Sequence, residues 1–425
     1  MKLKITKNSI LDILFILAYS VGYVSLLKFV TYALIPVPES IALFLFLFII
    51  YIIRFKGWRT YGMMLGGNLF TFLLILYIWE IVQGFIVGTD INAILVVIVN
   101  LLSTYVAYRY MNNIITIKGS VMPIIDCYSI YMYYTFFIII TSAVLLITTI
   151  LSSYSCPLGM NSLFRTNMEM DNVSYYFPGY LSVVYHTPSV LLGGLGFPSL
   201  SGLSHESQAM YYTIYPALFL MFCRGDNNTE NKIIVLFLIS TIITTSLTAA
   251  VCFMLTYALH LLWKFKDKGQ YKSVLLMLFS FSLLAYFVID SQFNEIINSF
   301  VLEKANFDSD GSSGSYSLSL LLYMLTPSGA LGQGILGSTS DQTMQFTANC
   351  GYISSMLILV FYVFFIYTSL KNVFSYNLLC HSIGLASFYF IAHSFKYGIS
   401  LFNSNYLFFM VFLMLYAEKR RKIVI

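Results

Sequence analysis

The sequence contains few charged residues. Of its 425 residues, 10% are charged and 59% are apolar, and the mean hydropathy is +0.80. A soluble domain carries about 25% charged residues, which cover its core. The shortage excludes a disordered chain and a soluble nucleic-acid-binding protein, and the net charge of +5 is no sign of a nucleic-acid partner. It indicates a polytopic membrane protein.

Cysteine is also scarce. The six cysteines are scattered along the chain without metal-ligand spacing, so a secreted disulfide scaffold is excluded and no zinc or redox site is indicated. We interpret them as small apolar fillers. The basic start MKLKITK runs into an apolar stretch that is too long for a cleavable signal peptide.

Long uncharged stretches recur along the whole chain. Twelve of them are about 15–25 residues long, the length needed to cross a hydrocarbon core. They predict an all-α integral membrane protein that forms one transmembrane domain over residues 1–425. Their approximate limits are 10–35, 40–53, 65–86, 92–110, 129–151, 206–223, 233–246, 248–263, 273–289, 350–370, 378–395 and 399–416.

The basic residues predict the orientation. With the N-terminus in the cytoplasm, all but four of the 23 Lys and Arg residues fall on the cytoplasmic side, as the positive-inside rule requires. Both termini are then cytoplasmic. The four exceptions, which lie outside or near the outer face, are Lys28, Arg165, Lys304 and Lys396.

The segment 233–263 has two interpretations. One long tilted helix would fit its length, but both flanks are basic, which favours a hairpin that turns at 244–248. Each arm would be roughly 18–22 Å long at about 1.5 Å per residue, too short for a core about 30 Å thick. A polar turn at this depth is tolerated where it lines protein or a water-filled cavity. The hairpin therefore indicates a cleft open to the outside.

Two long outer loops interrupt the pattern, at 152–205 and 290–349. Loops of this length usually have a function. Just after the first, a Gly/Pro/Ser-rich approach places His205 and Glu206 at the outer end of a helix. Glu206 is our first candidate for a general base that acts on a hydroxyl, and His205 is the second. The alternative is that Glu206 only stabilises the start of its helix.

Cations on the outer side could hold an anionic group. Arg165 is the best candidate because Arg binds phosphate through two parallel hydrogen bonds. Lys396, His186 and Lys304 are the further candidates. The alternative is that these cations meet lipid headgroups or pair with neighbouring carboxylates.

The second loop is rich in glycine and hydroxyl groups. Its stretches 308–316 and 326–334 permit tight turns, and exposed N–H groups of such a loop can cradle anions. A flexible polar loop is the alternative interpretation. Within the spans, Lys28 and Glu80 stand out, because intramembrane charges usually have a partner, and Lys28 could pair with Glu39 or Glu80.

This pattern resembles the bacterial O-antigen polymerases, within the wider family of polysaccharide polymerases and O-antigen ligases. The many spans and two dominant outer loops resemble the family's architecture. Locally, 202–207 resembles its Glu-containing motif at the outer end of a helix, and 244–249, with Ser246, resembles its Ser-rich hairpin motif. The stretches 312–316, 327–334 and 349–353 resemble its second-loop pattern, which includes Tyr316.

The sequence departs from the family at three points. Leu247 stands where the hairpin motif often has Arg, and Tyr316 stands near another expected Arg. The His-Asn pair common in ligases is represented at best by Ala348 and Asn349. These departures leave Arg165, Lys304 and Lys396 as substitutes for the phosphate-binding cations, and they weaken the ligase interpretation.

The resemblance implies a C-type glycosyltransferase fold in the bacterial inner membrane. It implies transfer of a growing glycan from undecaprenyl diphosphate to a new lipid-linked unit at the periplasmic face. Glu206 or His205 would take the acceptor proton, and Arg165 and Lys396 would hold the leaving diphosphate. Membrane lipids and a chain-length regulator are the other partners implied. No cofactor is expected, because the donor is already activated.

Two other activities remain as alternatives. A lipid-linked oligosaccharide flippase would favour two similar halves, short loops and charges that line the bundle. An O-antigen ligase would share the fold but use the lipid A core as acceptor.

Overall fold

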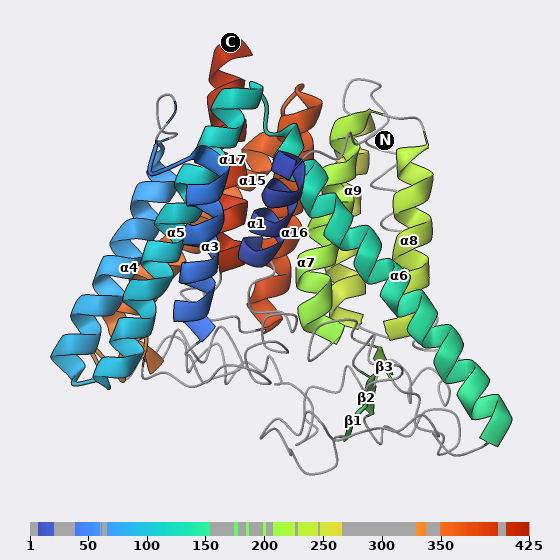
Figure 1. Ribbon diagram of the computed structural model, residues 1–425, viewed down its shortest axis with the longest axis horizontal. Helices are drawn as coiled ribbons and strands as arrows, with labels where there is room; N and C mark the ends of the chain where they lie inside the picture. Colours follow the sequence, from blue (N-terminus) through green and yellow to red (C-terminus); the bar gives the residue numbers. More distant parts are fainter. Residues whose placement is uncertain are drawn as a thin grey trace. The chain divides into compact units, whose positions relative to one another are not determined.

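A computed structural model describes the helical part of the chain (Figure 1). The described residues are 7–20, 39–59, 61, 66–153, 174–176, 184–186, 199–200, 207–225, 228–244, 247–265, 329–336, 349–397 and 405–424.

Helices dominate the described residues, as the sequence predicts, and every predicted span except 273–289 contains one. The helices are α1 (Lys7–Ser20), α3 (Glu39–Phe55), α4 (Asn68–Val87), α5 (Ile91–Lys118), α6 (Met122–Ser153), α7 (Ser207–Leu220), the 3₁₀ turn η3 (Met221–Arg224), α8 (Thr229–Thr244), α9 (Leu247–Phe265), α15 (Gly351–Val373), α16 (Leu378–Tyr397) and α17 (Asn405–Val424). Three short strands also occur: β1 (Ser174–Tyr176), β2 (Val184–His186) and β3 (Ser199–Leu200). The segment 273–289 lies outside the described residues.

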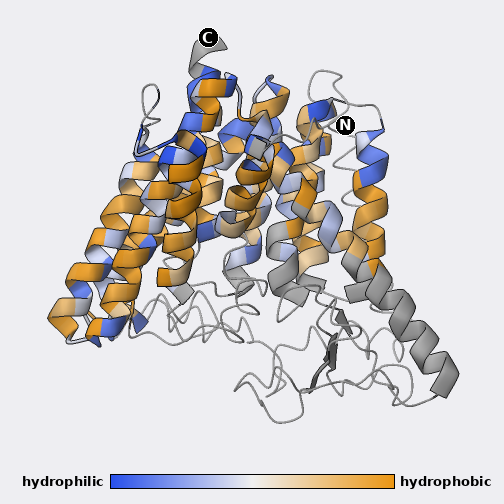
Figure 2. Cartoon of the chain, viewed as in Figure 1, coloured by the Kyte–Doolittle hydropathy of each residue, from blue (hydrophilic) through white to orange (hydrophobic). Residues whose placement is uncertain are grey.

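Among the described helices, α4, α5 and α15 are long and apolar enough to cross a membrane. Figure 2 shows apolar residues along the lengths of α4 and α5 and polar residues toward their ends. Many large apolar side chains are exposed on these helices, such as Ile78 and Val363 at 58% and 68%. Exposed apolar surface of this extent needs lipid to cover it. The chain is therefore a helical membrane protein, and its full number of spans stays a prediction.

The chain divides into two compact units. The first comprises 1–133, 216–226 and 319–425, and the second comprises 134–215 and 227–318. The boundary falls inside α6 and α7. The assignment of the whole chain to one transmembrane domain stays a prediction.

In the first unit, α5 is the central element of one side. It packs on α3 and α4, while α15 packs on α4 and α16, and α16 packs on α17 (Figure 1). Aromatic rings fill these contacts: Phe15 stacks on Tyr110 with 3.6 Å between ring centroids, and Phe70 stacks on Tyr108 at 5.0 Å.

The turn between α4 and α5 shows how local sequence sets helix ends. Gly88 ends α4 in a left-handed conformation, and its N–H donates to the Gly84 carbonyl. Only glycine adopts this conformation at little cost. Asp90 then caps α5 by accepting from the Asn92 N–H at 3.1 Å, because the first amides of a helix lack partners within it.

α5 runs to Lys118, well past the predicted limit of 110. The predicted span 92–110 ends next to Arg109, which the orientation places on the cytoplasmic side. Instead Arg109 is buried at 7% exposure, and its guanidinium lies over the Trp58 ring, 4.1 Å from the centroid. Asn112 and Asn113 are buried in the following turn. The predicted span ended where polar residues begin to interrupt the apolar run. In the structure these residues face protein, so the helix continues to Lys118 and is capped by Gly119.

In the second unit, the segment 233–263 forms two helices, α8 and α9, and not one long helix. Phe237 of α8 stacks on Phe253 of α9 with centroids 4.0 Å apart. The hairpin interpretation is thus supported by the described residues. In the same unit β2 pairs antiparallel with both β1 and β3.

Candidate functional site

The site begins on the buried face of α4. Seven residues of this helix are buried, namely Leu69, Leu73, Leu76, Tyr77, Glu80, Gln83 and Gly84. Their spacing of three and four places them on one stripe. Glu80 and Gln83 are the polar members of this apolar stripe, one turn apart.

Gln83 holds three segments together. Its Nε2 donates to the carbonyls of Leu331 and Cys350, at 2.7 and 2.9 Å. Its Oε1 accepts from the Ile335 N–H at 3.2 Å and from the Ser354 hydroxyl at 2.9 Å. All four hydrogen-bonding positions of this buried amide are satisfied. We call this cluster, Gln83 with the segments 329–336 and 349–354, the Gln83 junction.

A second residue of α4 reinforces the junction. The Trp79 indole N–H donates to the Ser354 hydroxyl oxygen at 2.8 Å. Ser354 thus accepts a hydrogen bond from Trp79 and donates one to Gln83, and both partners lie on α4. A chain of hydrogen bonds that is satisfied throughout, away from water, fixes a single arrangement of its members.

Two glycines make the close approach possible. Gly332 and Gly351 have φ values of +55° and +85°, in the left-handed region. A Cβ atom on Gly332 would lie 2.3 Å from the Asn349 carbonyl oxygen, and one on Gly351 would lie 2.4 Å from the Leu331 carbonyl carbon. Both distances are far inside van der Waals contact with backbone, so neither position accepts a side chain without movement.

The sequence suggested that N–H groups of this glycine-rich loop could cradle an anion. In the described part, those groups bind protein instead. Gln333 N donates to Asn349 O at 2.9 Å, Gly334 N to Leu331 O at 3.2 Å, and Ile335 N to Gln83. The prediction of an amide cradle is therefore wrong for Gln333 and Gly334, because their amides donate to Asn349 and to the loop itself. The flexible-loop alternative stays a prediction.

Glu80 lies one turn from Gln83 and is 1% exposed. Its Oε2 has no hydrogen-bond partner among the described residues. An ionised carboxylate in such surroundings is costly without a partner. Lys28, the partner that the sequence suggested, lies outside the described residues.

The junction presents a fixed polar segment at the first turn of α15. Gly329, Ala330 and Gln333 are exposed on it, whereas Gly334 and Ile335 are buried. An exposed amide side chain and open backbone next to glycines are groups that can hydrogen-bond sugar hydroxyls. In the described junction the Ser354 hydroxyl bonds to Trp79 and Gln83, Cys350 is buried, and there is no acid–base pair, so the junction could bind and position a substrate but not carry out the chemistry.

Most of the predicted site residues lie outside the described residues. These are Glu206, His205, Arg165, Lys304, Ser246 and Tyr316. The description of α7 begins at Ser207, directly after the predicted catalytic pair. Their roles therefore stay predictions.

Two predicted residues lie in described elements, without a description of their side chains. His186 is the last residue of β2, where its backbone pairs with Ser174. Lys396 lies in the last turn of α16. Their predicted contact with an anionic group is untested.

Among the described residues, no group of three or more His, Cys, Asp or Glu side chains could hold a metal ion. Comparison with protein-family models and with curated proteins gives no match.

Proposed function

We propose that this protein is a membrane-embedded polysaccharide polymerase, with about twelve spans and both termini in the cytoplasm. It would extend a glycan carried on undecaprenyl diphosphate by transferring it to the next lipid-linked repeat unit at the periplasmic face of the inner membrane. Glu206 or His205 would accept the proton of the attacking hydroxyl. Arg165, with Lys396 as the second choice, would stabilise the leaving diphosphate.

The observation that carries the proposal is the Gln83 junction. Two stretches that resemble the family's second-loop pattern, 327–334 and 349–353, are separated along the chain, yet their described parts bind each other. Tyr352 N donates to Gly329 O at 2.8 Å, and Ile353 N donates to Ala330 O at 3.2 Å. A glycine-rich segment that is held at the start of a helix favours a binding role over a connector role.

Deletion of the gene tests the proposal. A polymerase mutant should make lipid A core capped with a single repeat unit, because the flippase and the ligase still act. Uncapped core would contradict the proposal and would favour the flippase or ligase alternative. The readout is the ladder of lipopolysaccharide lengths on a gel.

Variants in the complemented strain test the chemistry. Glu206→Gln should abolish long chains while the protein stays in the membrane, whereas Glu295→Gln, in the predicted second outer loop, should leave them. Arg165→Ala should shorten or abolish chains, with partial rescue by Arg165→Lys. A Glu206→Gln variant that still makes long chains would exclude Glu206 as the base.

A further inference from the structure

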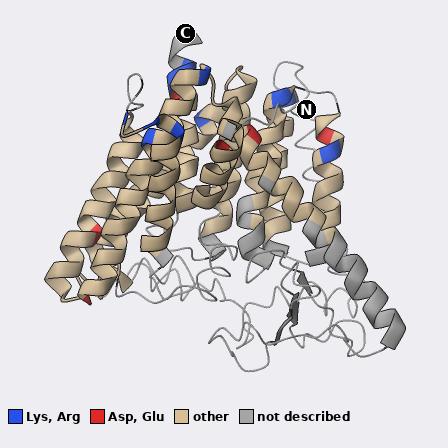
Figure 3. Ribbon diagram, in the orientation of Figure 1, with Lys and Arg blue, Asp and Glu red and all other residues tan. Residues whose placement is uncertain are grey.

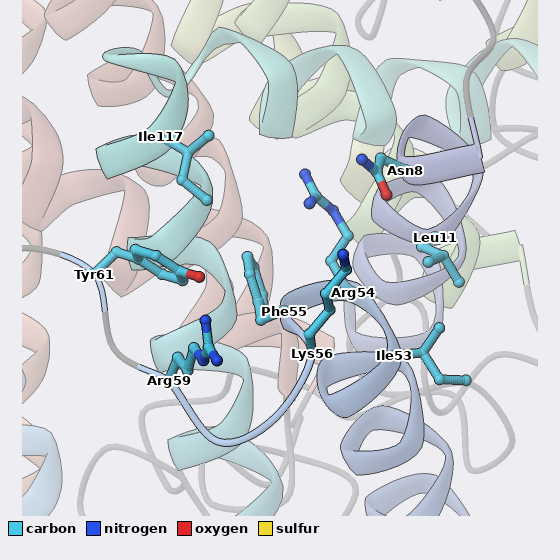
Figure 4. Close-up of a pocket in the computed structure, with 9 residues that line it drawn as sticks. All are labelled: Asn8, Leu11, Ile53, Arg54, Phe55, Lys56, Arg59, Tyr61 and Ile117. Carbon is cyan, nitrogen blue, oxygen red and sulfur yellow. The ribbon is translucent and has the colours of Figure 1, made fainter.

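A basic pocket lies near the end of α5, opposite to the end that follows the α4–α5 turn. It has a volume of about 390 Å³ and is lined by Asn8, Leu11, Ile53, Arg54, Phe55, Lys56, Arg59, Tyr61 and Ile117. Figure 4 shows that Arg54 comes from the last turn of α3, Lys56, Arg59 and Tyr61 from the connection that follows, and Ile117 from α5. All these residues belong to the first unit.

One of the three cations is already neutralised. Arg54 Nε donates to Asp12 Oδ1 at 2.8 Å, and its Nη2 donates to Asp12 Oδ2 at 3.3 Å. Tyr110 also donates to this carboxylate at 2.8 Å. Lys56 and Arg59, by contrast, are exposed and have no carboxylate partner among the described residues. The pocket therefore keeps two positive charges available for an anion.

The connection that carries these cations is held by buried side chains of α5. Asn113 Nδ2 donates to the Arg59 carbonyl at 3.0 Å, and its Oδ1 accepts from the Tyr61 N–H at 2.9 Å. The Asn112 amide also donates to the Tyr61 carbonyl, at 3.3 Å. A mere connector on the surface does not need buried amides to fix it, because water satisfies its backbone.

The turn is also tight and anchored by an aromatic ring. Lys56 and Gly57 have φ values of +53° and +122°. A left-handed conformation is uncommon for a residue with a side chain. Trp58, the next residue, lies under the Arg109 guanidinium. Lys56 and Arg59 thus lie at the two ends of a tight turn that Trp58 anchors against Arg109.

An apolar stripe leads into the pocket. Leu45, Ile49 and Ile53 lie four residues apart on one face of α3, and they are 48%, 55% and 52% exposed. Ile53 itself lines the pocket. A ligand with a phosphate at one end and hydrocarbon at the other would meet cations and then this stripe.

We propose that this pocket binds the phosphate of an anionic phospholipid headgroup, with the acyl chains along the α3 stripe. In the first unit, Lys and Arg gather at the end of the bundle where α17 finishes (Figure 3). The positive-inside rule places such an end on the cytoplasmic side, and basic pockets between helices on that side bind anionic headgroups. The proposal is independent of the polymerase activity and of the outer site.

The test compares lipid binding by the purified full chain in detergent, measured by native mass spectrometry with added phosphatidylglycerol or phosphatidylcholine. The wild type should prefer phosphatidylglycerol. The double variant Lys56→Asn/Arg59→Gln should bind it about thirty-fold more weakly, the loss expected for two cations near a headgroup. Asn at position 56 tolerates the left-handed conformation, which limits structural damage.

Two further variants keep the test decisive. Lys371→Gln/Lys419→Gln removes the same charge at exposed positions outside the pocket and should bind like the wild type. Arg59→Lys keeps the charge and should retain most of the binding. Equal binding of both lipids by the wild type, or equal loss in the two double variants, would overturn the proposal. Displacement of the lipid by millimolar inorganic phosphate would overturn the proposal that the ligand is a phospholipid and would indicate a soluble phosphate ligand.

Discussion

At the scale of the residue, Gly332 is a position where the Gln83 junction leaves no room for a side chain. Alanine there would combine a left-handed φ with a Cβ atom 2.3 Å from a carbonyl oxygen. We expect Gly332→Ala to lower the free energy of unfolding by about 2–3 kcal/mol. Thermal unfolding of the detergent-solubilised protein measures the loss.

The matched control is Gly329→Ala. Gly329 also has a positive φ, +94°, but a Cβ atom there would meet nothing within 4 Å. Only the conformational cost of about 1 kcal/mol applies. Equal losses in the two variants would show that the close approach of Gly332 to Asn349 does not matter.

Gln83 is the second residue-scale test, because its amide makes four hydrogen bonds. Gln83→Leu would remove four hydrogen bonds, each worth about 0.5–1.5 kcal/mol, and would leave the buried Ile335 N–H without this partner at a further cost of about 1–3 kcal/mol. The Leu331 carbonyl and Ser354 would keep their bonds from Gly334 and Trp79. We expect a loss of about 3 kcal/mol or more in thermal unfolding. Gln333→Leu is the control, since the Gln333 side chain is exposed and should change stability by less than about 0.5 kcal/mol. A small effect of Gln83→Leu would contradict the junction.

The importance of Gln83 was not predictable from the sequence. Its four partners lie 248 to 271 residues further along the chain, and no local pattern distinguishes it from other polar residues in apolar runs. The weak signal was its spacing of three from Glu80, which places two polar side chains on one face. The helices themselves were predictable, because a run of apolar residues must form hydrogen bonds within its own segment in lipid.

At the scale of the element, α8 and α9 are joined by a charged cluster at the end of the hairpin away from its turn. Lys264 Nζ lies 2.7 and 2.6 Å from the two oxygens of Glu230, and His260 Nε2 lies 2.8 Å from Oε1. Burial alone raises the pKa of Glu230, but the hydrogen bonds from Lys264 and His260 outweigh burial and hold that pKa below its usual range.

A pH dependence follows from this lowered pKa. The charged Glu230 stabilises the hairpin at pH values above the usual carboxyl pKa, and this contribution is lost as the pH falls through the lower pKa of the folded state. Glu230→Gln should therefore cost about 0.5–1 kcal/mol at pH 7, and the difference from the wild type should shrink as the pH falls below the usual carboxyl pKa and through the lower pKa of the folded state.

Thermal unfolding at a series of pH values gives this difference, and Glu230→Gln/Lys264→Met completes a double-mutant cycle. A coupling of zero at pH 7 would contradict the ion pair, and so would a coupling that does not weaken as the carboxylate is protonated in acid. The sequence indicated a hairpin from its two basic flanks, but it did not indicate that Lys264 of one flank pairs with Glu230 of the other. Nothing in a single sequence fixes the register of two helices.

At the scale of the whole molecule, the distribution of cations makes the topology testable. The connection between α4 and α5 contains Asp90 and no cation, whereas the end of α5 carries Lys118. Positive-inside orientation places Thr89 outside and Lys118 in the cytoplasm. Thr89→Cys should react with a membrane-impermeant thiol reagent in intact spheroplasts, and Lys118→Cys should react only after permeabilisation.

Four native cysteines, Cys127, Cys252, Cys350 and Cys380, are buried, but Cys223 is partly exposed and Cys156 lies outside the described residues, so the labelling of the native cysteines has to be measured. The parent protein, with its native cysteines, gives the background in each arm. α5 separates the two probes by 28 residues, about 42 Å at 1.5 Å per residue, which exceeds the hydrocarbon thickness of about 30 Å. Labelling of both probes from one side would therefore contradict a span at α5.

Reversed labelling would place the Gln83 junction, at the Thr89 end of α4, in the cytoplasm. Under the proposed function, lipid-linked repeat units are polymerised at the opposite, periplasmic face. The same result would move the basic pocket to the outer leaflet, so this one experiment bears on both proposals.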